Sequence, residues 1–131
     1  MIIIELKLNY EMGGKQEIVL LETITKVVSY EIRRPISNIM CFLERSKGVM
    51  DTSIDPLVLV SITCLRKIEI ETKEDICHAL LKVLQIVIPV VPERICINFM
   101  PIEASGTWQF YEGSPICPLT KREGEKDRIV H

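Results

Sequence analysis

Cysteine and histidine are the residue types in this chain that could bind a metal ion or carry thiol chemistry. The sequence of 131 residues contains five cysteines and two histidines. The cysteine count is odd and no two cysteines form a C-x-x-C pair, so the spacing favours neither a disulfide framework nor a zinc site. His78 lies in a helical pattern and His131 is the last residue, which leaves too few imidazoles for a histidine-rich metal site. We therefore expect no metal ion and no cofactor, and we expect the first four cysteines to be small buried hydrophobic residues.

The composition argues against two classes of partner. The net charge is −2 and aromatic residues make up only 5% of the chain, so the basic, aromatic-rich surface typical of a nucleic-acid-binding protein is missing. The longest apolar stretch, Leu80 to Val91, is too short to span a membrane and contains Lys82 and Gln85. The sequence also lacks the pattern of a secretory signal, so we expect a cytoplasmic protein.

A strand is expected at the very start of the chain. Residues 2–8, IIIELKL, are apolar and rich in β-branched side chains, and Gly13 and Gly14 close the segment. Chain ends are poorly ordered unless something holds them. A strand that begins at Ile2 therefore implies that the amino-terminal residues take part in the fold and in any site built there.

Five further elements follow from the spacing of apolar residues, prolines and caps. Their order along the chain is helix, strand, strand, helix and strand. They are a helix over residues 15–31 that Pro35 terminates, a strand over 36–43, a strand over 57–65, a helix capped by Thr72 and Asp75 that Pro89 terminates, and a strand over 94–100.

These elements predict two similar strand-helix-strand halves in one α/β (α+β) domain. A constant offset aligns Ile2 with Leu59 and Pro35 with Pro92. Tandem βαβ units of this size place two helices on one face of a four-stranded mixed sheet. The strands are apolar at nearly every position, which is typical of strands buried on both faces. We therefore expect a second copy of the chain to cover the face that the helices leave open.

Four short motifs resemble the macrophage migration inhibitory factor and D-dopachrome tautomerase family of the tautomerase superfamily. They are ELKLN at residues 5–9, RRP at 33–35, DP at 55–56 and PERICINFMPIE at 92–103. The resemblance covers residues 1–114 and implies a homotrimer whose three sheets close into a barrel, with a pocket at each subunit boundary. Residues 115–131 are charged with balanced signs, so we expect a disordered tail, with a docking tail as the alternative.

The resemblance also identifies the position of the catalytic base. In this family the base is an amino-terminal proline, freed by removal of the initiator methionine, and this position falls on Ile2. A tautomerase base must be partly unprotonated at working pH, and burial of a secondary amine lowers its pKa. Ile2 offers no secondary amine, and isoleucine is too large for routine removal of Met1. We therefore expect no catalytic residue in this chain.

Four residues are candidates for ligand binding on the same resemblance. Arg34 matches the basic residue that receives the acid group of the substrate, and Leu65 stands where an isoleucine presents its amide. Asn98 matches an asparagine of the fourth strand. The alternatives are that Arg34 is a solvated turn residue, that Asn98 satisfies backbone groups at a subunit edge, and that Trp108 anchors its segment instead of lining the pocket. The chain departs from the family at four positions. Asp51 and Thr52 stand in the stretch of the family's Gly-Gly pair, Arg66 occupies a glycine position, and Cys96 replaces a tyrosine.

The function expected from these residues is binding. We expect a catalytically degenerate, cytokine-like or regulatory homotrimer, released without a leader, that binds a cell-surface receptor, a protein partner or a small aromatic keto acid. The alternative is a keto-enol tautomerase acting on phenylpyruvate-like or dopachrome-like substrates. A third possibility is a purely structural subunit without a functional pocket.

Overall fold

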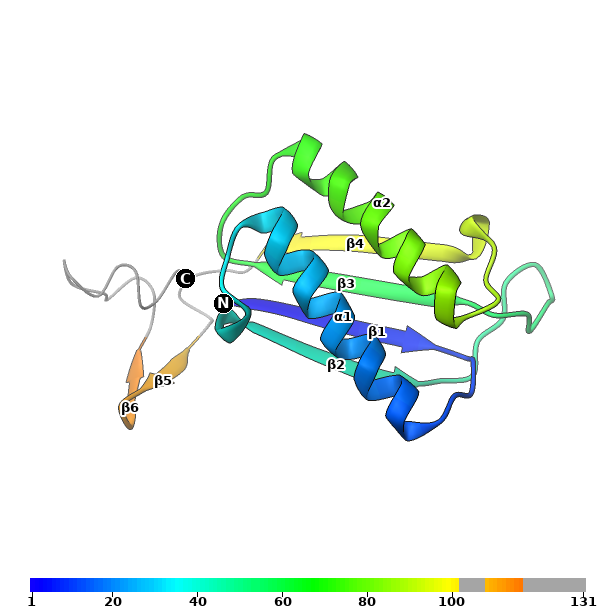
Figure 1. Cartoon of the computed structure of the whole chain (residues 1–131), viewed down its shortest axis with the longest axis horizontal. Coiled ribbons are helices and arrows are strands. Elements are labelled where there is room, and N and C mark those ends of the chain that lie inside the picture. Colours follow the sequence, from blue (N-terminus) through cyan, green and yellow to red (C-terminus); the bar gives the residue numbers. More distant parts are fainter. Residues whose placement is uncertain (102–107, 117–131) are drawn as a thin grey trace.

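The long elements follow one another in the predicted order of strand, helix, strand, strand, helix and strand (Figure 1). The computed structural model describes residues 1–101 and 108–116. The elements are β1 (Ile2–Leu8), α1 (Gly14–Ile32), the 3₁₀ turn η1 (Ile36–Asn38), β2 (Ile39–Arg45), β3 (Val58–Cys64), α2 (Ile70–Val87), the 3₁₀ turn η2 (Pro92–Arg94), β4 (Ile95–Pro101), β5 (Gln109–Tyr111) and β6 (Ser114–Ile116).

The four long strands form one mixed sheet in the order β2-β1-β3-β4. β1 runs parallel to β2, β3 runs parallel to β4, and the central pair β1 and β3 is antiparallel. Both helices lie over the same face of this sheet (Figure 1). The predicted tandem βαβ architecture, a two-layer α+β fold, is confirmed.

The core lies between the sheet and the helices. Side chains alternate along a strand, so every second residue of a strand points toward the helical layer. In β1 these residues are Ile2, Ile4, Leu6 and Leu8, and each is at most 2% exposed. The helices contribute one buried stripe each, formed by Leu20, Ile24 and Val28 of α1 and by Ile76, Leu80 and Leu84 of α2.

The other face of the sheet, which we call the outer face, is more polar than the sequence predicts. β1 is not apolar at nearly every position, because Glu5 and Lys7 point outward and are exposed in the single chain, and burial of this face by a second copy stays a prediction. Apolar side chains also lie on the outer face, where Met40 and Phe42 of β2 and Met100 of β4 are about half exposed. In the single chain this face therefore mixes charged and apolar residues, as a sheet face open on one side does.

The two halves repeat with a spacing one residue shorter than predicted. β1 begins at Ile2 and β3 at Val58, so Ile2 corresponds to Val58 and not to Leu59. The prolines mislead because Pro35 precedes η1 whereas Pro92 is the first residue of η2. A one-residue slip moves a strand residue to the opposite face. The corrected alignment pairs two buried residues, whereas Leu59 lies on the outer face.

Two predicted boundaries are also wrong. The predicted strand over 36–43 begins three residues later, since Ile36–Asn38 forms a 3₁₀ turn. α2 begins at Ile70 with Glu69 at its N-cap, so Thr72 lies inside the first turn and does not cap the helix. Glu69 has the extended backbone of an N-cap, with φ of −66° and ψ of 152°, so the helix begins ahead of the predicted capping pair.

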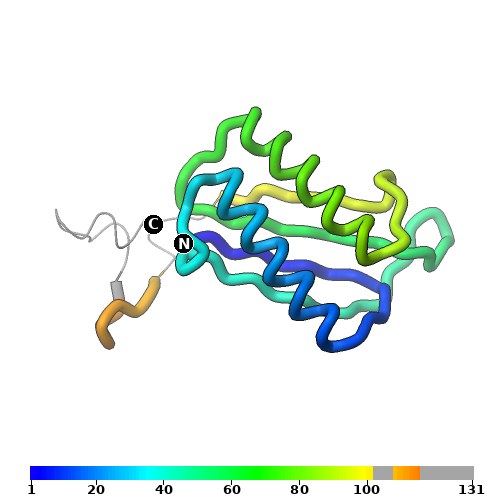
Figure 2. Tube along the Cα trace, in the orientation of Figure 1, coloured from blue at the N-terminus to red at the C-terminus, as the bar shows by residue number. Residues whose placement is uncertain are grey.

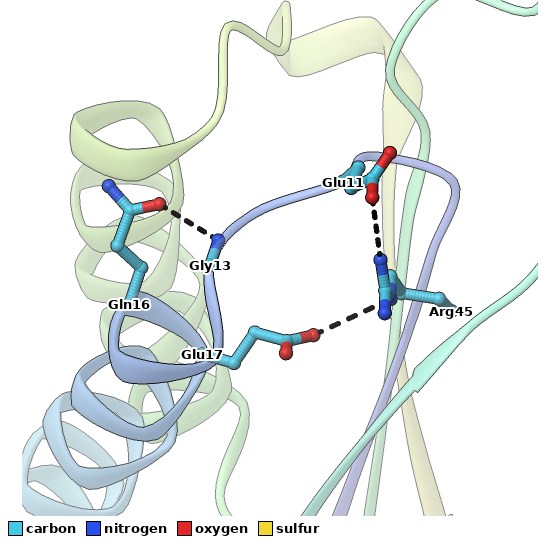
Figure 3. A network of polar contacts seen from close by, with 5 residues as sticks. All are labelled: Glu11, Gly13, Gln16, Glu17 and Arg45. Atoms are coloured by element: carbon cyan, nitrogen blue, oxygen red, sulfur yellow. Dashed lines mark hydrogen bonds and ion pairs between the residues drawn. The ribbon is translucent and has the colours of Figure 1, made fainter.

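The connection between β1 and α1 is fixed by polar contacts with the end of β2 (Figure 3). The Gly13 amide donates to Oε1 of Gln16 at 3.2 Å, which satisfies one free donor at the helix start. Arg45 forms ion pairs with Glu11 at 3.5 Å and with Glu17 at 3.7 Å. The Arg45 side chain is half exposed, Glu11 is exposed and Glu17 is partly buried, so the contacts orient the connection and add little stability.

At the same end of the sheet, two side chains hold the long connection between β2 and β3, which projects beyond the sheet (Figure 2). Nδ2 of Asn9 donates to the carbonyl oxygens of Ile54 and Asp55 at 3.1 and 3.2 Å, and Oδ1 accepts from the Leu57 amide at 2.7 Å. Arg94 donates to the carbonyl oxygens of the same connection. Both residues belong to the motifs that carry the family resemblance.

The remaining strands form a small hairpin. β5 and β6 are antiparallel and turn at Glu112 and Gly113, both with positive φ. β6 runs through residue 114, where we placed the domain boundary, and the predicted tail from residue 117 onward lies outside the described residues, so the boundary stays a prediction. Within the described residues, neither long helix is apolar enough to cross a membrane.

Candidate functional site

A cleft of about 760 Å³ lies at the end of the sheet where β1 begins. Its walls come from three segments that the fold brings together: the last residues of α1, the connection from β3 to α2, and the start of α2. We call it the amino-terminal cleft. The N-terminus lies at this end of the molecule (Figure 1).

The turn after α1 holds two arginines at the cleft. The helix ends at Arg33, whose φ of 61° is a left-handed conformation usually taken by glycine. The amides of Arg33 and Arg34 both donate to the Ser29 carbonyl, at 2.9 and 3.2 Å, and the Ser29 hydroxyl donates to the Arg34 carbonyl. Three hydrogen bonds to one serine therefore fix the turn that positions Arg34.

The cleft is rich in charge of both signs. Arg33, Arg34, Arg66 and Lys67 line it, together with three acidic residues. The acidic residues are Glu31, Glu69 and Asp75. The cleft therefore offers cationic and acidic side chains to a polar ligand.

The Met1 α-amine is the titratable group whose pKa this environment changes. Burial lowers its pKa below the ordinary value of 8.0, Arg34 and Arg66 lower it further, and Cys64 acts in the opposite direction. Desolvation and neighbouring cations both disfavour the ammonium form. This amine is therefore neutral more often at pH 7 than an exposed α-amine.

Ile2 belongs to the core and does not face the cleft as a functional side chain. It is 2% exposed and is part of the main hydrophobic cluster. As the first residue of β1 it is paired with Ile39 on one side and with Cys64 on the other. Position 2 therefore has a structural role in this chain, in packing and in strand pairing.

The fold separates the other predicted ligand residues. Leu65 lines a second, neighbouring cavity, and Arg34 lines the amino-terminal cleft but not that cavity. Asn98 is exposed on the outer face and accepts a contact from the thiol of Cys96 at 3.7 Å. Trp108 is 57% exposed just before β5. In the single chain only Arg34 lies at the cleft, and the ligand roles of all four residues stay predictions.

Sequence reasoning missed Arg66. We treated it as a replacement for a family glycine, but it lines the cleft and helps to lower the pKa of the Met1 amine. The signal was the adjacent pair Arg66 and Lys67 directly after the third strand.

The cysteines behave differently from one another. Cys41, on the core side of β2, has its pKa raised to about 11 by burial, and Cys77 also has a raised pKa. Cys96 is exposed, so the expectation that it is buried is wrong, because it lies at an outer-face position of β4. Among the residues that the structure describes, no group of three potential ligands could hold a metal ion.

The fold is similar to that of several solved structures. No protein-family model and no curated protein matches the sequence. The solved structure of a macrophage migration inhibitory factor-like protein from Entamoeba histolytica matches with a TM-score of 0.77 at 17% identity, covering 88% of this chain and 98% of the other. The macrophage migration inhibitory factor of Toxoplasma gondii matches with a TM-score of 0.76 at 18% identity, covering 87% and 99%.

A fused 4-OT, which is a symmetric trimer, matches with a TM-score of 0.70 at 12% identity, covering 79% of this chain and 87% of the other. At such identities the likeness concerns the backbone arrangement. The order of the four strands and the two helices on one face agree with it. The chain therefore has the macrophage migration inhibitory factor-type tautomerase fold that its motifs predict.

Proposed function

We propose that this chain is a catalytically degenerate macrophage migration inhibitory factor-like protein that acts by binding. The observation that carries the proposal is the state of Ile2. The residue at the position of the family's catalytic proline is an isoleucine whose side chain is 2% exposed in the core. A buried aliphatic residue packs and cannot transfer a proton.

The expected retention of Met1 supports the same proposal. With Met1 in place, the nitrogen of Ile2 is an amide and the α-amine lies one residue further out. A base displaced by about an ångström can lose on the order of a hundredfold in rate. We propose that the amino-terminal cleft binds a small aromatic keto acid or a protein partner, with Arg34 contacting the acid group.

We propose that the protein works as a homotrimer, in the cytoplasm or after leaderless release, and that a cell-surface receptor is among its partners. Met40, Phe42 and Met100 on the outer face give a second copy apolar surface to cover. The fused 4-OT of the same fold is a symmetric trimer. Asn98 and Trp108 are exposed in the single chain, and a ligand role for either of them depends on this assembly.

The alternative function is keto-enol tautomerisation, and one observation favours it. The lowered pKa of the Met1 amine leaves a larger neutral fraction of a primary amine near the cations of the cleft. A neutral amine can act as a general base, and Arg34 could hold the carboxylate of a phenylpyruvate-like substrate. This reading requires the Met1 nitrogen to replace the proline nitrogen at a shifted position.

Tautomerase turnover of phenylpyruvate separates the two functions. We expect the full chain to show turnover near background while phenylpyruvate still binds in calorimetry, with Arg34→Ala weakening binding. Robust wild-type turnover that Arg34→Ala abolishes would contradict the binding proposal and support the enzyme. The mass of the purified chain shows in the same preparation whether Met1 is present.

Ile2→Pro provides the matched variant. Proline is tolerated at the first residue of a strand, and removal of Met1 before proline would expose a secondary amine. We expect weak but measurable turnover in this variant, with circular dichroism confirming that it folds.

The assembly is tested separately by sedimentation. We expect a species of about three times the 15.0 kDa of the chain. A stable monomer at micromolar concentration would contradict the proposed trimer.

A further inference from the structure

A second cavity lies beside the amino-terminal cleft, on the other side of the connection that follows β3. Its volume is about 360 Å³, within the range of sites that hold small ligands. It is bounded by this connection, by the first turn of α2 and by the last residues of β4. We call it the Lys73 cavity, after the residue that α2 contributes.

The charge of the Lys73 cavity has one sign. Arg66, Lys67 and Lys73 line it, and no acidic residue does so among those that the structure describes. In the described part of the chain, none of these three cations forms an ion pair with a carboxylate. The amino-terminal cleft differs, since acidic residues balance most of its cations.

Lys73 is fixed at the border between charge and apolar surface. Its ammonium lies 5.6 Å from the centroid of the Phe99 ring, and the residue is partly buried. An ammonium over an aromatic face is held by the ring's quadrupole and retains donors for another partner. The contact therefore holds the charge close to the apolar part of the cavity.

The rest of the lining is apolar. It consists of aliphatic and aromatic side chains from β3, from the connection and from β4. Those at the sheet are Ile62, Phe99 and Met100, and Leu65 and Ile68 come from the connection. A ligand that fits both parts has an apolar body and one acidic group.

We propose that the Lys73 cavity binds a small amphipathic organic anion, with its acid group against the three cations and its apolar body against Phe99 and the neighbouring aliphatic side chains. This site adjoins the keto acid site of the proposed function and shares Arg66 and Lys67 with it, but of the two sites only this one is lined by Lys73 and Phe99. Its occupation does not require any activity in the amino-terminal cleft. Charge complementarity selects the anion, because a neutral ligand would leave the cations without a counter-charge. The apolar part of the lining favours an amphipathic ligand over an inorganic ion.

Two fluorescent dyes of nearly the same shape test the proposal. The anion is 1-anilinonaphthalene-8-sulfonate, and the uncharged counterpart is N-phenyl-1-naphthylamine. We expect the folded full chain to bind the sulfonate more tightly than the neutral dye. Lys73→Met retains an apolar stem over Phe99 but removes the charge, and it should weaken sulfonate binding about tenfold while changing the affinity for the neutral dye by about twofold or less.

Matched variants locate the binding site. Lys67→Met should weaken sulfonate binding as well, and Lys73→Arg should preserve it. Lys82→Met removes an exposed charge further along α2, outside the cavity, and should have no effect. Arg34→Met removes a charge that lines the amino-terminal cleft and not the Lys73 cavity, so it should weaken sulfonate binding much less than Lys73→Met does.

Three results would overturn the proposal. The first is unchanged sulfonate affinity in both Lys67→Met and Lys73→Met. The second is an equal loss in Arg34→Met, which would place the anion in the amino-terminal cleft. The third is equal affinity of the wild-type chain for the two dyes, which would make the site merely apolar. Thermal unfolding of each variant verifies that the chain remains folded in the titration.

Discussion

The two ends of the sheet both carry arginines, and the surroundings of these arginines differ. At the end where β1 finishes, Arg94 donates to four carbonyl oxygens, those of Pro56, Met50, Ser53 and Asp55, at 3.0 to 3.2 Å. At the end where β1 begins, Arg66 is exposed and lines two cavities without an ion pair in the described part of the chain.

This difference separates a structural arginine from one available to a ligand. A guanidinium offers five donors in a fixed plane, and Arg94 uses its donors on the backbone of one connection. The guanidinium donors of Arg66 lie in the walls of two cavities instead. An arginine thus stabilises the fold at one end of the sheet, and at the other end an arginine adds positive charge to a potential binding surface.

The largest effect is expected when Arg94 is replaced. Arg94→Met removes hydrogen bonds to four carbonyls and should lower the free energy of unfolding by about 2–3 kcal/mol, because bonds to a charged group are the stronger kind. Chemical denaturation measures this change. The matched variant Arg45→Met removes an arginine at the same end that forms only exposed ion pairs, and its loss should stay below about 1 kcal/mol. Equal losses would remove the distinction between the two arginines.

A smaller effect of opposite sign is expected in the same connection. Asp51 and Thr52 have φ of 53° and 56°, a left-handed conformation that is unfavourable for a β-branched residue. Thr52→Gly should stabilise the chain by roughly 0.5–1 kcal/mol, since the relief of about 1–2 kcal/mol exceeds the entropic cost of glycine. Thr52→Ala keeps the positive φ with a Cβ atom and serves as the control in thermal unfolding. A gain in the alanine variant as large as in the glycine variant would refute the explanation from backbone strain.

Replacement of Arg66 should leave stability nearly unchanged. Arg66→Met should alter the free energy of unfolding by less than about 0.5 kcal/mol, as is usual for exposed residues without specific partners. Denaturation measured beside Arg94→Met makes the comparison direct. A loss comparable with that of Arg94→Met would mean that Arg66 supports the fold and is not reserved for a ligand.

The smallest expected effect is a pH dependence of the free energy of unfolding, which arises from the Met1 amine. The pKa of the Met1 amine is lower in the folded chain than its ordinary value of 8.0, so the unfolded chain binds more protons between these two values. The free energy of unfolding should therefore rise with pH in this window and lose this contribution as pH falls through the folded pKa. Chemical denaturation measured as a function of pH, below and above 8.0, gives the slope.

Two variants sharpen this measurement. Acetylation of the Met1 amine should abolish its share of the slope. Arg66→Met should reduce the slope, because one of the cations that lower the pKa is gone. A slope that is unaffected by acetylation would assign the pH dependence to other groups.

Much of the fold could be predicted from the sequence because local patterns encode it. The apolar stripes of α1 and α2 and the β-branched run at residues 2–8 predict their elements closely. The offset between the halves was wrong by one residue because proline positions were used as markers. The structure shows that Pro35 and Pro92 occupy successive positions of their turns, which no pattern of single residues reveals.

The candidate site was less predictable. Arg34 was found through its motif, whereas Leu65 and Arg34 turned out to line different cavities and Asn98 lies on the outer face. Which side chains share a cavity depends on distances between segments far apart in the chain. Spacing within one segment carries no information about these distances.

The sequence by itself determined the element types, their order and the isoleucine at position 2, since propensity, periodicity and residue identity are local properties. Only the tertiary structure decided that the side chain of Ile2 packs in the core and that Arg94 donates its hydrogen bonds to the connection between β2 and β3. It also decided that Arg66 lies between two cavities. The physical reason is that burial, hydrogen-bond satisfaction and the shift of the Met1 pKa arise from contacts between segments that the fold brings together.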